Sequence, residues 1–198
     1  MDEERLAKNE RIRISCKATK LRRKQQLCRV YHVKIDFSHL NRYKQKAIKM
    51  LFVEAKWLYN DVLTFTNTRD INEYDYKVTE VHVLDKNKKP VMRTLEYLGS
   101  QMKQSVIQGL KFSLKSLKAT KRSGRKIGQL KYKSDYNSIN LQQHGITYKF
   151  HDNKHVKIQN IEVVKIRGAN QFINIPGLEF ANAKLMNLPD GYYYQQTP

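Results

Sequence analysis

An alternating pattern of apolar and polar residues marks the first ordered element of the chain. Tyr31, Val33, Ile35 and Phe37 alternate with polar or charged residues. A period of two places these four side chains on one face, which is typical of a strand that buries one side. The pattern therefore predicts a strand over residues 29–37.

Two longer segments carry apolar residues at spacings of three and four, which predicts two amphipathic helices. The first helix is expected over residues 41–67, with Ser38 or Asn41 as its N-cap. The second is expected over residues 92–119. The apolar face of the first helix consists of Leu51, Ala55, Leu58, Val62 and Phe65, and that of the second consists of Leu98, Met102, Val106, Leu110, Leu114 and Leu117.

The segment between the helices and the last third of the chain have strand character. Residues 70–90 read as a connection with a short strand or hairpin at residues 77–84. Further strands are expected at residues 138–141, 145–150, 155–159, 162–167, 172–175, 179–186 and 191–195. The order of one strand, two helices and several strands predicts an α+β fold, a small β-barrel interrupted by a helical insertion.

This order suggests three parts. Residues 1–28 are polar and basic and are expected to form a helical or partly disordered arm. Residues 29–38 and 135–198 form the expected barrel. Residues 39–134 form the helical lobe, which ends in a basic loop at residues 121–134.

The charge distribution points to a polyanionic partner. The chain has 38 Lys and Arg against 18 Asp and Glu, a formal net charge of +20. Residues 97–134 contain ten basic residues and no acid, and residues 11–35 contain nine and no acid. A solvated helix face usually mixes both signs, so nucleic acid is the expected partner. The alternative is a soluble domain whose charge runs are only solvated.

The basic loop is the strongest candidate site, because its cations stand beside two glycines and an aromatic residue. Such residues neutralise phosphates, allow a backbone to approach closely and stack on a base. The candidates in this loop are Lys121, Arg122, Arg125, Lys126, Lys131, Tyr132 and Lys133. Further candidates on the second helix are Lys103, Gln104, Lys111, Lys115 and Lys118. Those on the N-terminal arm are Arg22, Arg23 and Lys24, within a cluster that also holds Arg11, Arg13, Lys17 and Lys20.

Glutamine side chains offer a means of reading bases. Gln104, on the polar face of the second helix, and Gln142 and Gln143, in the turn before residue 145, can hydrogen-bond an adenine edge. They can equally be ordinary exposed polar residues. Tyr59 and Asn60 are expected to be structural, with Asn60 bonding to the backbone. Tyr132 is open to two interpretations, core packing or base stacking.

Catalytic and metal chemistry find no support in the sequence. Cys16 and Cys28 are too far apart for a CxxC motif, and no second pair exists, so neither zinc nor a disulfide framework is expected. His151 and His155 fall in a strand and turn, where a spacing of four does not bring them together. No cofactor is expected. No apolar run approaches the roughly 18 residues of a membrane span, and a cytoplasmic location is expected.

Several motifs, in this order, resemble the N-terminal half of TnpB, the RNA-guided nuclease of insertion sequences, and the related miniature type V CRISPR effectors. The strand at residues 31–37 is similar to the first strand of that family. Residues 55–60 (AKWLYN) resemble a family helix that ends in an aromatic-Asn pair. Residues 123–134 (SGRKIGQLKYKS) resemble its glycine, proline, Phe-Lys-Ser segment, with Gln-Leu in place of the usual Phe-Pro. Residues 156–168 and 190–193 resemble a strand pair and the hairpin before the nuclease domain.

The resemblance implies a wedge domain, an oligonucleotide-binding-like barrel, interrupted by a helical recognition lobe. In that family these parts hold guide RNA and read a short motif on duplex DNA. The metal-binding carboxylates of the family's RuvC nuclease would lie beyond Pro198. The chain is therefore expected to bind guide RNA and duplex DNA and not to be an enzyme itself.

Three other interpretations remain open at this stage. One is a transposase-type DNA-binding protein that uses the two helices as a helix-turn-helix, although that motif needs a turn of about 3–4 residues. Another is an RNA-binding protein of ribosomal type. The last is a homodimer formed through the helical lobe.

Overall fold

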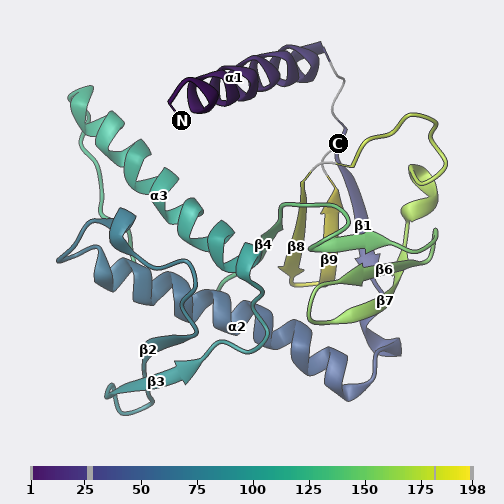
Figure 1. The fold of residues 1–198 in the computed structure, drawn as a ribbon. Helices are drawn as coiled ribbons and strands as arrows, with labels where there is room; N and C mark the ends of the chain where they lie inside the picture. Colours follow the sequence, from purple (N-terminus) through teal and green to yellow (C-terminus); the bar gives the residue numbers. More distant parts are fainter. Residues whose placement is uncertain (1, 26–28, 181, 197–198) are drawn as a thin grey trace.

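The protein has an α+β fold, in which helices are inserted into a curled antiparallel sheet (Figure 1). The computed structural model describes residues 2–25, 29–180 and 182–196. Seven strands form the sheet in the spatial order β4-β8-β9-β1-β7-β6-β5. These strands are β1 (Tyr31–Ile35), β4 (Ser138–Leu141), β5 (Tyr148–Phe150), β6 (His155–Ile158), β7 (Glu162–Arg167), β8 (Ala183–Leu188) and β9 (Gly191–Gln196).

A helical insertion separates β1 from the other strands of the sheet in sequence. It contains helix α2 (Arg42–Phe65), the hairpin of β2 (Glu80–Leu84) and β3 (Pro90–Thr94), and helix α3 (Ser100–Arg122). The hairpin occupies the connection between α2 and α3, so these helices do not form a helix-turn-helix. The predicted α+β class and the order of its elements are confirmed.

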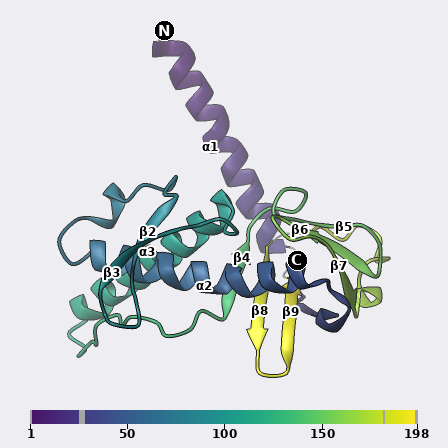
Figure 2. The ribbon, with the colours of Figure 1, turned by 90° about the horizontal axis from the view of Figure 1, so that it is seen from below.

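Helix α2 joins the sheet to the insertion. Its N-cap is Asn41, whose side-chain oxygen accepts a hydrogen bond from the Lys44 backbone N–H, so one of the two predicted caps is confirmed. Near its N-terminus, Lys44 Nζ donates to the Val163 carbonyl of β7 at 2.7 Å. Its C-terminal half packs on β2 and α3 (Figure 2). The predicted apolar face is buried apart from Phe65, which is half-buried.

Helix α3 begins eight residues later than the sequence predicted, because residues 92–94 belong to β3. β3 pairs with β2, with Val91 opposite Val83. The chain between β3 and α3 is then held by the buried Glu54 carboxylate of α2, which accepts backbone N–H groups of residues 96, 97 and 98 at 2.8–3.1 Å. Burial raises the pKa of this carboxyl above its ordinary value. Leu98 is buried as expected, but it precedes the helix.

Most of the predicted strands of the last third are present, but residues 172–175 are not a strand. The short 3-10 helix η3 (Ala169–Gln171) precedes them, and Pro176 and Gly177 follow. Gly168 begins this turn with a φ of 100°, a conformation that favours glycine. Phe172 is fully buried, and its ring lies 5.4 Å from that of Phe150. The apolar run therefore fills an aromatic core instead of extending the sheet.

Helix α1 (Asp2–Gln25) stands apart from the rest of the molecule (Figures 1 and 2). Almost all of its described side chains are exposed, and Arg22 makes a long contact of 3.5 Å with Glu179. An exposed pair of this kind stabilises little. The expected basic arm is thus helical. Among the described residues, no helix is long and apolar enough to cross a membrane.

Candidate nucleic-acid interface

One face of α3 is lined with amide and cationic side chains. Its members recur at alternating spacings of four and three, which places them on a single helix face. They are Gln104, Gln108, Lys111, Lys115, Lys118 and Arg122. Gln104, Lys115, Lys118 and Arg122 are exposed, whereas Gln108 and Lys111 are half-buried. We call these six residues the polar face of α3.

Two of the lysines predicted on this helix are engaged by the protein itself. Lys103 is only 8% exposed, and its Nζ donates to the Val78 carbonyl at 2.8 Å. Burial lowers its pKa, and the nearby Glu54 opposes that effect. We therefore remove Lys103 from the candidate interface. Lys111 Nζ donates to the Tyr76 hydroxyl and lies 4.7 Å from the centre of that ring, so its ammonium is partly committed.

The cations continue past the end of α3. Gly124, at φ +77°, ends the helix, and its N–H donates to the Lys121 carbonyl at 3.0 Å. The cations that follow stand on an extended segment. We define the basic segment as Lys121, Arg122, Arg125, Lys126 and Lys131, all of which are exposed. Within the part of the chain that the structure describes, none of them forms a salt bridge.

Asn60 fixes the end of this loop against α2. Its Oδ1 accepts from the Lys133 backbone N–H at 2.8 Å, and its Nδ2 donates to the Lys133 carbonyl at 3.0 Å. The Lys133 ammonium lies 4.4 Å from the ring centres of both Tyr59 and Tyr136. Burial lowers its pKa. Asn60 and Tyr59 are thus structural, as predicted, and Lys133 anchors the segment through its backbone and its ammonium.

Tyr132 is turned outward at this anchor. Its side chain is 58% exposed, which excludes the core-packing interpretation. Its hydroxyl is within 3.4 Å of Thr64 Oγ1 and 3.5 Å of Asn67 Nδ2, so the ring rests beside the C-terminal half of α2. The Tyr132 ring is therefore accessible for stacking.

Glutamines from two elements meet beside the N-terminal half of α3. Gln101 Nε2 donates to Gln143 Oε1 at 2.6 Å, and Gln142 Nε2 donates to Gln108 Oε1 at 3.2 Å. Gln104 is exposed one turn from Gln108. The structure thus places Gln142 and Gln143 against Gln108 and Gln101, on either side of the exposed Gln104 along α3. Sequence analysis missed Gln101 and Gln108, although their spacing of three and four from Gln104 was available as a signal.

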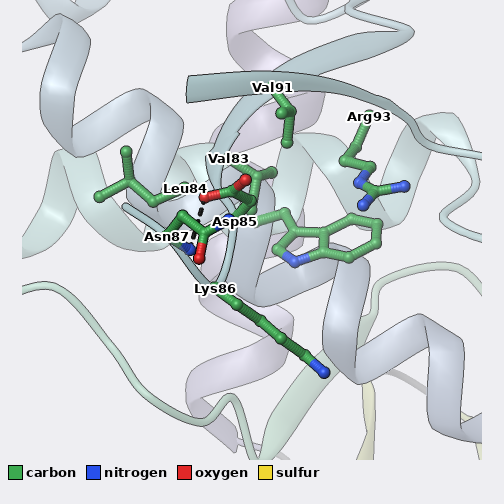
Figure 3. Close-up of a pocket in the computed structure, with 8 residues that line it drawn as sticks. Val83, Leu84, Asp85, Lys86, Asn87, Val91 and Arg93 are labelled. Atoms are coloured by element: carbon green, nitrogen blue, oxygen red, sulfur yellow. Dashed lines mark hydrogen bonds between the residues drawn. The ribbon is translucent and has the colours of Figure 1, made fainter. Parts of the chain in front are cut away.

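Two hollows flank Trp57, the single tryptophan of the chain. Figure 3 shows one of about 460 Å³, lined by Val83, Val91 and Arg93 of the hairpin and by its turn. That turn is fixed by Asp85, whose carboxylate accepts the Asn87 backbone N–H at 2.8 Å. The other hollow, of about 620 Å³, lies between α2, the hairpin and residues 132–134. Sequence analysis did not anticipate either hollow.

The predicted candidates on α1 are only partly described. Arg22 and Lys24 are exposed, and Arg22 is the residue that contacts Glu179. The side chain of Arg23 lies outside the described residues, as does Cys28. The described part of this arm makes its long-range contact through Arg22 with Glu179, away from the basic segment, and Figure 2 shows α1 pointing away from α3.

The histidines and carboxylates of the described residues do not gather into a metal-binding geometry. The described residues contain no group of three His, Cys, Asp or Glu side chains able to hold a metal ion. His155 is paired with Asp152 at 2.9 Å, an interaction that lowers the pKa of the carboxyl. His151 is exposed.

Comparison of the chain with models of known protein families and with curated proteins finds no match to either.

Proposed function

We propose that this chain is a nucleic-acid-binding protein, the N-terminal portion of a TnpB-like RNA-guided DNA endonuclease, related to type V CRISPR effectors. The observation that carries the proposal is the acid-free run of exposed cations on the polar face of α3 and the basic segment. Cations without carboxylate partners retain their full attraction for phosphates, and phosphate contacts supply most of the affinity for a nucleic acid.

The arrangement of the elements supports this proposal at a coarser level. A curled antiparallel sheet receives a helical insertion after β1, and the basic segment leads from that insertion into β4. In the proposal the sheet corresponds to the wedge domain and the insertion to the recognition lobe. Asn60 also ties the aromatic-Asn motif to the segment resembling Phe-Lys-Ser.

In this proposal one surface binds RNA phosphates and another binds the base edges of DNA. The basic segment, with Lys115 and Lys118, contacts the phosphates of a structured guide RNA. Gln104 hydrogen-bonds base edges of a short duplex DNA motif through its exposed amide, which presents a donor and an acceptor side by side. The neighbouring glutamines bond to one another and border this position. The chain has a binding role and no catalytic step, and it needs no cofactor for binding.

The test is binding of the purified chain to its co-purifying RNA, an unrelated structured RNA and a plain DNA duplex, from about 50 to 500 mM salt. The proposal predicts that one structured RNA is retained at salt concentrations that release the other two. Equal, salt-sensitive binding to all three would contradict it and would leave only a generic basic protein.

A ribosomal-type RNA-binding protein is a second candidate, favoured by α1. This helix is basic, exposed and separate from the fold, as expected of an RNA-inserted tail. In that case a chain lacking residues 1–28 would lose most of its RNA affinity in the same assay. The first proposal predicts that most of the affinity remains, because the basic segment is intact.

A further inference from the structure

We propose that the larger hollow beside Trp57 holds an unpaired nucleobase of a single-stranded nucleic acid. This inference rests on the proposed function, since it places a base site beside the surface that binds phosphates. We call this hollow the aromatic groove. Its floor is formed by Trp57, Asn60 and Thr64 of α2, and its walls are formed by the β2–β3 hairpin and residues 132–134.

The floor follows from helical geometry. Trp57, Asn60 and Thr64 are spaced by three and four, so they share one face of α2. Trp57 is only half-buried, although it packs on the core, and the part of it that lines the groove remains available. Trp57 lines both hollows, and so do the hairpin residues Val83 and Leu84, whose side chains Figure 3 shows at the smaller one.

The walls include apolar and aromatic side chains, which base stacking requires. Leu84 lines the groove from the hairpin and is 66% exposed, and Tyr132 lines it from residues 132–134 and is 58% exposed. Exposed aromatic faces on such a platform contribute stacking with any base. The volume of about 620 Å³ is within the range of about 300–1,000 Å³ found for small-molecule sites, which is room enough for a base.

The charge of the side chains that line the aromatic groove favours a nucleic acid over an apolar peptide as its ligand. Lys56 and Lys133 line the groove, and none of its described lining residues is a carboxylate, with Asp61 lying behind the lining residue His82 at 3.5 Å. Tyr132 also stands between Lys131 and Lys133, at the end of the basic segment. A strand whose phosphates follow that segment therefore passes the mouth of the groove.

The geometry also selects an unpaired base. Bases in a duplex are stacked on one another and turn only their edges outward, so their faces are not available to side chains. A single strand can splay one base out and insert it between aromatic side chains. The groove is thus distinct from the glutamines of α3, which are suited to base edges.

The single tryptophan makes this proposal directly measurable. Stacking of a base on Trp57 quenches the intrinsic fluorescence, and no other indole contributes to the signal. The probes are single strands of about ten nucleotides, one DNA and one RNA of the same mixed sequence, with an abasic strand of equal length and a duplex. Quenching by the single strands, and none by the abasic strand or the duplex, is expected.

The variant that tests the groove is Tyr132→Ala. It should weaken single-strand binding about tenfold, the cost of losing one stacked base, and should not change binding of the abasic strand. Tyr132→Phe keeps the ring and should behave as the natural chain does. Tyr43→Ala removes a similarly exposed tyrosine from the first turn of α2 and serves as the control.

If Tyr132→Ala binds single strands with unchanged affinity and its fluorescence is still quenched, the proposal that a base occupies the groove is wrong. Quenching by an apolar peptide but by neither oligonucleotide would also overturn it and would assign the groove to a protein partner. The abasic strand reports on the proposed function separately. If it binds equally well after Lys121, Arg122, Arg125 and Lys126 are changed to Ala, the phosphate-binding role fails whatever the groove does.

Discussion

Asp36 joins the end of β1 to its neighbours. Its carboxylate accepts hydrogen bonds from Arg167 Nη2 at 2.8 Å and Arg167 Nε at 3.2 Å, and it also contacts His39 Nδ1 at 2.9 Å and Ser38 Oγ at 3.2 Å. The Arg167 hydrogen bonds, followed by that of His39, lower its pKa from 3.8 to about 2. The folded state therefore binds this proton less tightly than the unfolded chain.

This pKa gives the first prediction. Stabilisation by Asp36 should be fully present above pH 3.8 and should be lost as the pH falls from there towards 2. Asp36→Asn should lower Tm at pH 7 and flatten the dependence of Tm on pH across that window. Thermal melting followed by circular dichroism measures both. Glu73→Gln makes the same charge change at an exposed site. It should change neither the Tm at pH 7 nor the dependence of Tm on pH. If the two variants behave alike, Asp36 does not have the stabilising role described.

Single positions also show where sequence reasoning fails. The sequence predicts both Lys103 and Gln104 as nucleic-acid contacts, but they are adjacent, and successive residues of a helix point about 100° apart. Lys103 consequently turns inward to the Val78 carbonyl, whereas Gln104 stays exposed. Residue type marks both side chains as candidates for binding, but their positions around the helix decide which one is exposed.

At the scale of elements, the loop after α3 is held at one end by a side chain that is distant in sequence. Asn60 forms two hydrogen bonds with the backbone of Lys133. Asn60→Ala should remove both and should cost about 1–2 kcal/mol of local stability. The open state would then be about 5–30 times more populated.

Limited trypsin digestion measures this effect, because Lys131 and Lys133 are cleavage sites within the anchored segment. Cleavage there should accelerate in Asn60→Ala. Asn67→Ala changes an asparagine two residues after the end of α2, whose side chain makes a 3.5 Å contact with Tyr132, and it should leave the rate nearly unchanged. Equal cleavage rates in the natural chain and both variants would show that Asn60 does not hold the segment.

Local patterns predicted the elements that carry their own signal. Asn41 and the spacing from Leu51 to Val62 were enough to predict α2. β3 was missed because its pairing with β2 is what stabilises it, and nothing local distinguishes residues 90–94 from a helix start. The segment at residues 172–175 was mistaken for a strand because an apolar run shows burial but not conformation.

At the scale of the molecule, the order of the sheet could not be predicted. β1 pairs with β9 on one side and β7 on the other, and these contacts join residues more than 130 positions apart. The basic stretches could be predicted from the sequence alone, since their lack of acidic residues is visible there. The structure adds that the cations are exposed together, and it reveals the aromatic groove, whose walls come from separate elements.

The central claim is that nucleic acid binds at a defined surface and does not merely respond to net charge. The most direct test compares two variants that each lower the formal charge from +20 to +16. One changes Lys121, Arg122, Arg125 and Lys126 to Ala. The other changes four exposed lysines in or beside the sheet strands to Ala, namely Lys149, Lys154, Lys157 and Lys165.

The measurement is the slope of log affinity against log salt for the co-purifying RNA. Each phosphate contact contributes about 0.7–0.9 to that slope, so loss of four contacts should reduce it by about three. The account predicts this reduction for the basic-segment variant and an unchanged slope for the sheet variant. Equal reductions in both variants would contradict it, because the RNA would then be responding to total charge alone.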